Sequence, residues 1–180
     1  SPQPFPQAEY IITESTYGDR LHEVRQDAEK HLQRIVADTC VTRKGKLIIP
    51  AFSLGRTQEV VYSLNRLYNS GELPPIPVYV DSPLAISATE IMRKHSEYFN
   101  PDMIQYMKKD DDPFGFETLH YIREVEDSKA LNEMEGPCII ISASGMLEAG
   151  RIKHHVKNNI SNPDNTILIV GYVPPGSLGG

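Results

Sequence analysis

The fold is decided by one stretch of sequence, Pro137-Cys138-Ile139-Ile140-Ile141-Ser142-Ala143-Ser144-Gly145. An unbroken apolar run that includes three consecutive isoleucines is typical of a strand buried on both faces of a parallel sheet. Small and polar residues follow immediately, as expected where a strand ends and a turn begins. We therefore predict that this run is the central strand of the sheet.

Short apolar runs alternate with helical spacing on both sides of this stretch. Further strands are predicted at 8–13, 47–49, 76–80, within 116–125, and at 167–170. Apolar residues recur at helical spacing over 21–35, 60–67, 91–99, 128–134 and 152–160. Ser87 and Glu90 predict a capping box for the third helix, and 100–113 is predicted to be an exposed connection. The pattern predicts an α/β, doubly wound, Rossmann-like fold with a mainly parallel five- or six-stranded sheet and helices on both faces.

Composition excludes several classes of protein. The chain has 180 residues, 39% of them apolar, and a net charge of −6, which disfavours a generally basic nucleic-acid binder. No apolar run is long enough to span a bilayer, and the proline-rich start has no signal-peptide pattern, so we expect a cytoplasmic protein without membrane contact. Cys40 and Cys138 have no metal-ligand spacing; we expect buried, reduced thiols and no metal bound by this chain.

Polar or glycine-containing segments follow the predicted strands. They begin at Glu14, Ser53, Asp81, Ser142 and Gly171. In a doubly wound sheet such segments gather at the carboxyl ends of the strands, which is where open α/β sheets bind ligands. Hydroxyl groups and helix N-termini at that edge suit phosphate. The sequence therefore predicts a phosphate-binding edge.

These segments also resemble a known family, the β-CASP domain of metallo-β-lactamase-fold ribonucleases, which includes the cleavage and polyadenylation endonuclease subunit. The matching stretches, in chain order, are Glu14-Ser15-Thr16-Tyr17-Gly18-Asp19-Arg20, Ile49-Pro50-Ala51-Phe52-Ser53-Leu54-Gly55-Arg56, Tyr79-Val80-Asp81-Ser82-Pro83-Leu84, Ser142-Ala143-Ser144-Gly145-Met146 with Gly150-Arg151, and Val170-Gly171-Tyr172. The resemblance implies a zinc-dependent hydrolase that cleaves RNA phosphodiester bonds between two domains. The other domain, of metallo-β-lactamase type, would hold two zinc ions, mainly through an HxHxDH motif.

None of the six histidines of this chain forms that motif. The resemblance therefore implies a β-CASP domain at 8–173, preceded by a linker at 1–7 and followed by a tail at 174–180 that leads back to the metallo-β-lactamase domain. The implied partners are RNA and that domain of the same polypeptide; a homodimer stays open. The isolated chain would bind no zinc and cleave no RNA.

The resemblance gives Glu14 a catalytic role. It would orient a histidine, supplied from beyond Gly180, that protonates the leaving oxygen. A helix cap or turn carboxylate is the alternative. Candidate RNA-binding residues are Arg56 and Arg151, which could hold phosphate, and Ser144 with Gly145, which could offer a hydroxyl and a backbone N–H.

Structural roles are the alternatives for these candidates and the prediction for several other residues. Arg56 and Arg151 could form surface ion pairs, and Ser144-Gly145 a simple turn. Asp81 is predicted to be an Asx turn or cap before Pro83, with a contact at the domain interface as the alternative. His154-His155 is predicted to be structural, and Asp110-Asp111-Asp112 a solvated loop.

Two other functions remain open. One is a non-catalytic scaffold in an RNA-processing complex, because the zinc ligands that such members lose lie outside this chain. The other is a nucleotide-binding module, although neither GxGxxG nor GxxxxGK[ST] occurs in the sequence.

Overall fold

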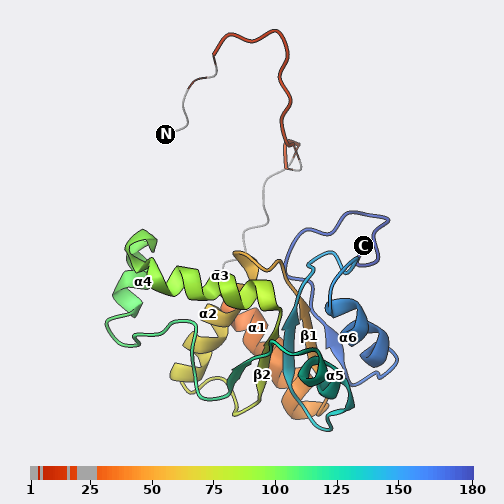
Figure 1. The fold of residues 1–180 in the computed structure, drawn as a ribbon. Helices are drawn as coiled ribbons and strands as arrows, with labels where there is room; N and C mark the ends of the chain where they lie inside the picture. Colours follow the sequence, from red (N-terminus) through yellow and green to blue (C-terminus); the bar gives the residue numbers. More distant parts are fainter. Residues whose placement is uncertain (1–3, 5, 16, 20–27) are drawn as a thin grey trace.

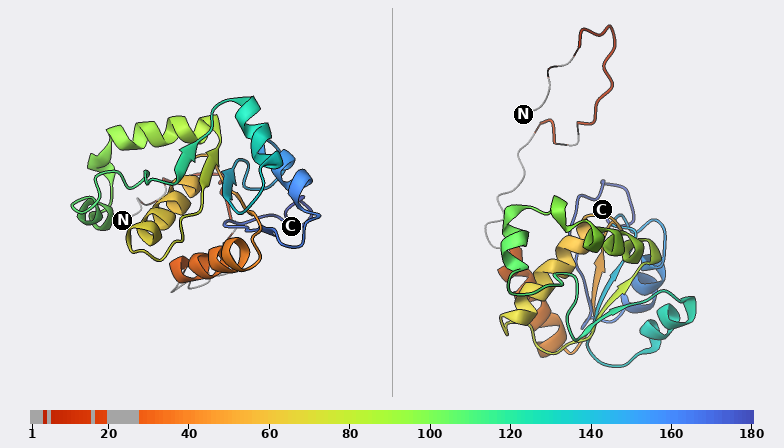
Figure 2. Two further views of the ribbon diagram at one scale, coloured as in Figure 1. Left: turned by 90° about the horizontal axis from the view of Figure 1, so that it is seen from below. Right: turned by 60° about the vertical axis from the view of Figure 1, so that its left-hand side comes forward.

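The computed structural model describes residues 4, 6–15, 17–19 and 28–180. Five parallel strands form one sheet in the order β3-β2-β4-β1-β5, with helices on both faces (Figures 1 and 2). The strands are β1 (Leu47–Pro50), β2 (Val78–Asp81), β3 (Leu119–Tyr121), β4 (Ile139–Ser142) and β5 (Thr166–Ile167). The α/β fold with a parallel sheet is confirmed, and β4 is its central strand as predicted.

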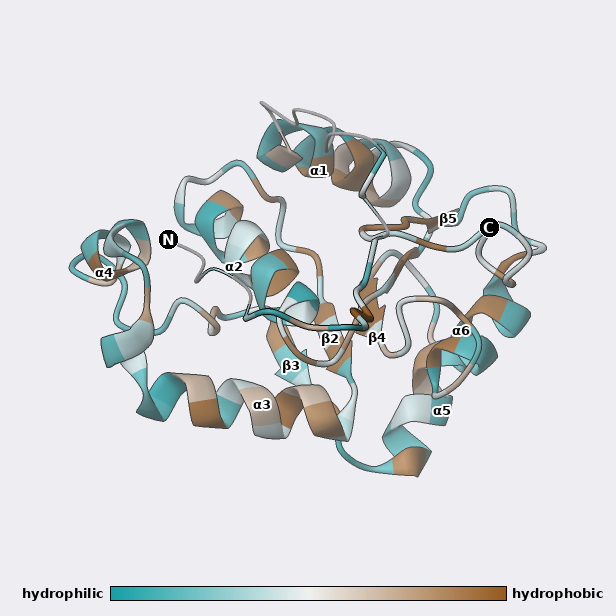
Figure 3. Cartoon of the chain, turned by 90° about the horizontal axis from the view of Figure 1, so that it is seen from above, coloured by the Kyte–Doolittle hydropathy of each residue, from teal (hydrophilic) through white to brown (hydrophobic). Residues whose placement is uncertain are grey.

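The two faces of the sheet follow from the two-residue period of a strand. Leu47 and Ile49 of β1 belong to the larger apolar cluster, whereas Ile48 between them belongs to a smaller one on the other face. Strand β4 lies in the middle of the molecule and is strongly hydrophobic (Figure 3), whereas the edge strand β3 is only partly buried. Burial on both faces explains why the strands read as continuous apolar runs.

Different helices cover the two faces. Helices α1 (Ala28–Val36), α2 (Arg56–Asn69) and α3 (Pro83–Lys94) contribute to the larger cluster. Helices α5 (Val125–Glu133) and α6 (Ile152–Asn159) contribute to the two clusters on the other face, α5 through Leu131 and α6 through Ile152 and Val156. The remaining elements are a π-helix η1 (Ala37–Thr42), a 3₁₀ turn η2 (Ser96–Tyr98) and α4 (Pro101–Tyr106).

Helix α3 begins earlier than predicted. Its N-cap is Ser82, whose Oγ accepts a hydrogen bond from the Ala85 N–H at 3.3 Å, and Pro83 occupies the first turn. A proline in the first turn loses no helical hydrogen bond and already has a helical φ angle. The predicted capping box of Ser87 and Glu90 is therefore wrong, because Ser87 lies inside α3 and not at its beginning.

Three other expectations fail at the ends of the chain and in one connection. Residues 8–13 form no strand, and Ile12 is fully exposed, because no neighbouring strand accepts its backbone. The segment 6–15 instead leads away from the body of the domain (Figure 1). The connection 100–113 contains α4, and the last strand ends at Ile167. Of the helix predicted over 21–35, residues 21–27 lie outside the described part. No described helix is long and apolar enough to cross a membrane.

Candidate nucleic-acid interface

The carboxyl ends of β1, β2 and β4 are joined by hydrogen bonds into one edge. The Ala51 N–H donates to Ser142 O at 3.0 Å, and Ser142 Oγ donates to Asp81 O at 2.8 Å. The hydroxyl groups of Ser53 and Ser82 lie 3.2 Å apart. Segments that are 29 to 91 residues apart in the sequence therefore meet at one place, as the parallel topology predicts.

The segment after β1 is fixed by a buried glutamine. Gln58 accepts a hydrogen bond from the Gly55 N–H at 2.8 Å and donates to Ser53 O and to Thr89 Oγ1. These bonds hold 52–55 against α2 and α3, and they leave Leu54 68% exposed. Arg56 begins α2 and is half-exposed, with its guanidinium 2.7 Å from Glu59. The ion pair expected as the alternative for Arg56 is present, and the side chain still lies at the surface.

The segment after β4, residues 143–150, closes on itself; we call it the 143–150 loop. The Ser144 N–H donates to Ala149 O and the Ile152 N–H to Ala143 O. Gly150 has φ of +77°, and a Cβ atom there would lie 2.4 Å from Ala143 O. Only glycine tolerates both the conformation and the close approach. The loop therefore has a defined shape rather than an adaptable one.

Ser144 and Gly145 lie in this loop in different surroundings. Ser144 is partly exposed, whereas Gly145 is buried. A Cβ atom at Gly145 would lie 3.1 Å from the ring of Phe52, so the ring lies directly over this glycine. The Phe52 side chain remains 44% exposed. The sequence analysis did not single out Phe52 as a candidate, although it lies two residues after β1 within the stretch Ile49–Arg56.

Asp81 is buried in a polar network that the sequence did not predict. Its carboxylate is fully buried and accepts hydrogen bonds from Ser128 Oγ (2.5 Å), Arg151 Nη1 (2.7 Å) and His155 Nε2 (2.6 Å). Burial raises the pKa of Asp81, but the hydrogen bonds from His155, Ser128 and Arg151 outweigh it and lower that pKa. The predicted Asx turn or cap is wrong, because Ser82 caps α3 and the carboxylate points to α5 and α6.

Arg151 belongs to this network rather than to the open surface. Its side chain is 20% exposed, and its second terminal nitrogen donates to Arg123 O at 2.7 Å. His155 is fully buried, which confirms the structural role predicted for it, and His154 is exposed. The partners of Asp81 are up to 74 residues away in sequence, so no local pattern could reveal them.

Glu14 is exposed and lies three residues before Tyr17. The Tyr17 ring packs edge-on against Tyr172, with ring centroids 6.1 Å apart. Tyr172 follows the last strand, so this contact brings the N-terminal segment beside the chain that leaves β5. Glu14 is not brought into contact with Ser144 or Arg56 by any hydrogen bond or ion pair described for these residues.

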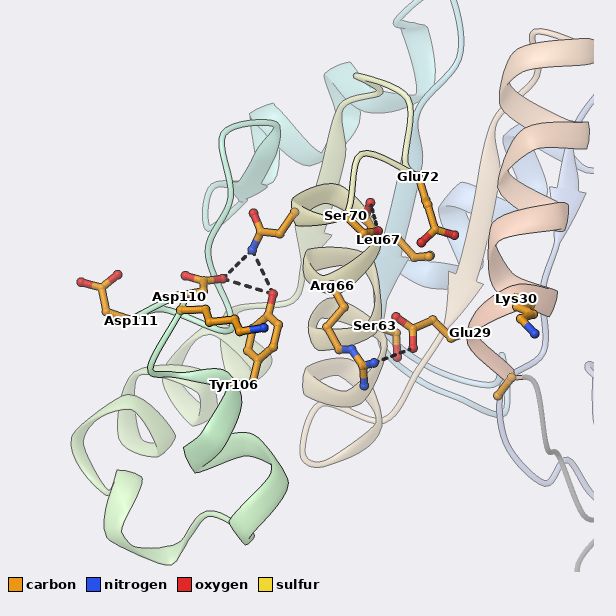
Figure 4. A pocket seen from close by; sticks show the side chains of 13 residues that line it. Glu29, Lys30, Ser63, Arg66, Leu67, Ser70, Glu72, Tyr106, Asp110 and Asp111 are labelled. Atoms are coloured by element: carbon orange, nitrogen blue, oxygen red, sulfur yellow. Dashed lines mark hydrogen bonds and ion pairs between the residues drawn. The ribbon is translucent and has the colours of Figure 1, made fainter.

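Other polar groups lie away from this edge. Asp112, predicted to be solvated, forms a bidentate ion pair with Arg93. A hollow of about 1100 Å³ lies between α1, α2 and α4 (Figure 4), with both acidic and basic side chains around it. In residues 4, 6–15, 17–19 and 28–180, no group of three or more His, Cys, Asp or Glu could hold a metal ion.

A parallel sheet with helices on both faces places the chain in the α/β, Rossmann-like class of domains. Within that class, residues 57–180 match the family model described as the Beta-Casp domain. The chain belongs to the β-CASP family.

Three similar proteins support this assignment. The chain is 37% identical over 175 residues to a protein named Ribonuclease TTHA0252 from Thermus thermophilus, a match covering 97% of this chain and 40% of that protein. It is 36% identical over 178 residues to the Transcription termination factor FttA of Methanosarcina mazei, covering 97% and 28%. It is 33% identical over 171 residues to an RNase J-like protein of Methanocaldococcus jannaschii, covering 94% and 38%. The chain thus spans less than half the length of these relatives.

Proposed function

We propose that this chain is the RNA-clamping domain of a longer ribonuclease and that RNA lies along the carboxyl edge of its sheet. One observation carries the proposal: nearly the whole chain aligns with a protein named a ribonuclease, and the aligned part accounts for 40% of that protein. The rest of that relative is long enough for a separate catalytic domain. In the complete protein to which this chain is proposed to belong, that domain would be the metallo-β-lactamase domain expected from the sequence.

The surface at this edge suits an RNA strand. Ser144 offers a hydroxyl group for a phosphate, and Arg56 offers a guanidinium at the beginning of α2. Phe52 adds an exposed ring on which a base can stack, a contact worth about 1–3 kcal/mol per base. Gly145 supports that ring from below. Because the whole chain carries a charge of −6, attraction to RNA must come from such local contacts.

The proposed role of Arg151 changes with its surroundings. Its guanidinium is committed to Asp81 and to two backbone carbonyl groups, of Ile122 and Arg123. A phosphate ligand would have to compete with a buried carboxylate at 2.7 Å. We therefore propose that Arg151 serves the RNA site by holding the 143–150 loop, and that Arg56 is the residue that contacts phosphate.

Glu14 is proposed to act in catalysis in the complete protein. A carboxylate that accepts a hydrogen bond from a histidine fixes the orientation of the imidazole and favours its protonated form. The contact between Tyr17 and Tyr172 places this segment beside the chain that runs on toward Gly180. A histidine supplied from beyond Gly180 would have to approach along that side.

Zinc is proposed for the complete protein only. When bound in the other domain, two zinc ions would supply a hydroxide and neutralise charge on the phosphate. The contributions proposed for this chain are to bind RNA and to orient a proton donor.

The name of a second relative favours an alternative. A protein 36% identical to this chain is named a transcription termination factor. The same RNA-clamping edge could therefore serve termination of transcription. Cleavage of naked RNA by the complete protein, without RNA polymerase, distinguishes a ribonuclease from a factor that acts only on a transcribing complex.

Glu14→Gln in the complete protein tests the catalytic role. We expect the cleavage rate to fall by about 10²- to 10⁴-fold, the usual contribution of general acid catalysis, with bound zinc and RNA affinity unchanged. Glu9→Gln, which alters another exposed carboxylate of the same segment, is the matched control and should keep full activity. Full activity of Glu14→Gln with a lowered melting temperature would instead show a cap or turn.

A further inference from the structure

The 143–150 loop is tied to a single outside residue at both of its ends. Before the loop, Ser142 Oγ donates to the backbone carbonyl of Asp81 at 2.8 Å. After the loop, Arg151 Nη1 donates to the carboxylate of Asp81 at 2.7 Å. Because Asp81 ends the neighbouring strand β2, this one residue fixes how far apart the two ends of the loop lie.

Asp81 is itself held by other elements. Its Oδ2 atom accepts hydrogen bonds from Ser128 of α5 and His155 of α6. Arg151 extends the connection to the chain after β3 through its bond to Arg123 O. The carboxylate therefore joins β2, α5 and α6 directly and the end of β3 through Arg151. All of these contacts lie beneath the edge proposed to bind RNA.

Both ring nitrogens of His155 have a hydrogen-bonding partner. Nδ1 lies 2.9 Å from Asn132 Oδ1, an atom that also accepts a hydrogen bond from Asn159 Nδ2 at 3.3 Å. Nε2 lies 2.6 Å from the Asp81 carboxylate. The imidazole ring is therefore held from both sides, by α5 through Asn132 and by β2 through Asp81.

Arg151 and His155 thus share one buried carboxylate. Arg151 directly precedes α6, and a further cation, Lys46, donates from Nζ to the carbonyl oxygens of Leu131 and Asn132 in α5. A carboxylate that accepts a charge-assisted hydrogen bond from an arginine is held more firmly than a neutral acceptor. The loop is therefore anchored to a fixed point.

We propose that Asp81 is a positioning residue for RNA binding: its carboxylate, shared by Arg151 and His155, fixes the 143–150 loop in the shape that presents Ser144 to RNA. Asp81 is fully buried and touches no RNA itself. The inference rests on the proposed function, because contact between this loop and RNA is itself proposed.

The first test uses the isolated chain and does not depend on RNA. Asp81→Asn removes the charge and places an amide against three donors. The amide hydrogens of Ser144, Leu147 and Ile152, which close the loop, should exchange about 10- to 100-fold faster, as expected from losing a hydrogen bond between charged groups. Asp112→Asn removes a bidentate ion pair elsewhere and should leave these three amides unchanged.

The second test uses the complete protein and an uncleavable RNA. Arg151→Gln accompanies Asp81→Asn, because it leaves Asp81 paired with His155 and should fold even if Asp81→Asn does not. Both variants should weaken RNA binding by about 2- to 10-fold, the value of roughly one hydrogen bond, and Asp112→Asn should not. Unchanged loop exchange in Arg151→Gln overturns the proposal. Faster loop exchange with unchanged RNA affinity supports the anchoring of the loop and shows that the proposed RNA contact is wrong.

Discussion

Asp81→Asn is expected to be among the most destabilising single substitutions at this edge. The Asp81 side chain is fully buried, and its three partners include a fully buried histidine and an arginine that is 20% exposed. Removing one partner of a buried ion pair leaves the other charge uncompensated and costs about 3–5 kcal/mol. For a chain of this size that corresponds to a fall of about 6–20 °C in melting temperature.

The assay is urea unfolding of the isolated chain, followed by circular dichroism, with Asp112→Asn as the control. The Asp112 side chain is 42% exposed and pairs with Arg93; the loss should be at most about 1 kcal/mol, as for surface ion pairs. Equal losses of unfolding free energy in the two variants would refute the reasoning, because the buried ion pair of Asp81 would then contribute no more to stability than the exposed ion pair of Asp112.

The direction of the Asp81 pKa adds a test of the same variant in acid. The pKa is lowered because hydrogen bonds from His155, Ser128 and Arg151 outweigh burial. Stability from Asp81 is therefore fully present above the pKa of an unfolded aspartate, about 3.9, and is lost as the pH falls through the lower folded pKa. The difference in stability between wild type and Asp81→Asn should narrow below about pH 4. A difference that stays constant to lower pH would show that Asp81 is not the titrating group.

Three further predictions concern single side chains. Burial raises the pKa of Cys40 to about 12 and that of Cys138 to about 11. Iodoacetamide at pH 8 should therefore label neither thiol in the folded chain and both thiols in urea. Rapid labelling of the native chain would contradict this prediction. Gly55→Ala should lower the free energy of unfolding by about 1–2 kcal/mol because of its φ of +83° alone. Gly150→Ala should lower it further, because Ala143 O would lie 2.4 Å from the new Cβ atom. Equal losses of stability in denaturant would mean that the 143–150 loop adapts to the added side chain. Arg56→Ala in the complete protein should weaken RNA binding and reduce the salt slope by about 0.7, whereas an unchanged slope would make Arg56 only the partner of Glu59.

The sheet could be predicted from the sequence because its signal is local. A parallel strand buried on both faces reads as an apolar run, and Leu47–Pro50 and Ile139–Ser142 are such runs. The prediction of a strand at 8–13 is wrong because an apolar pattern alone does not form a strand; a neighbouring strand must also be present to pair with it. The start of α3 was missed because Ser87 and Glu90 were interpreted as its capping box, although Ser82 followed by Pro83 also suits the start of a helix.

The candidate site was predictable only in part. The gathering of Ser53, Asp81 and Ser142 at one edge follows from parallel topology, and their hydrogen bonds confirm it. The interior network was not predictable, because Asp81, Ser128 and His155 come from separate elements and each residue alone has an ordinary local role. Packing decides such pairings, and packing depends on the whole fold.

The most direct test of the central claim is to map where RNA contacts the complete protein. An RNA that carries 4-thiouridine should be bound, irradiated, and the cross-linked peptides identified. We predict that cross-links fall in 52–56 and in the 143–150 loop, with Phe52 and Ser144 among the labelled residues. Cross-links confined to α4 and the hollow between α1 and α2, with none at the carboxyl edge, would contradict the claim.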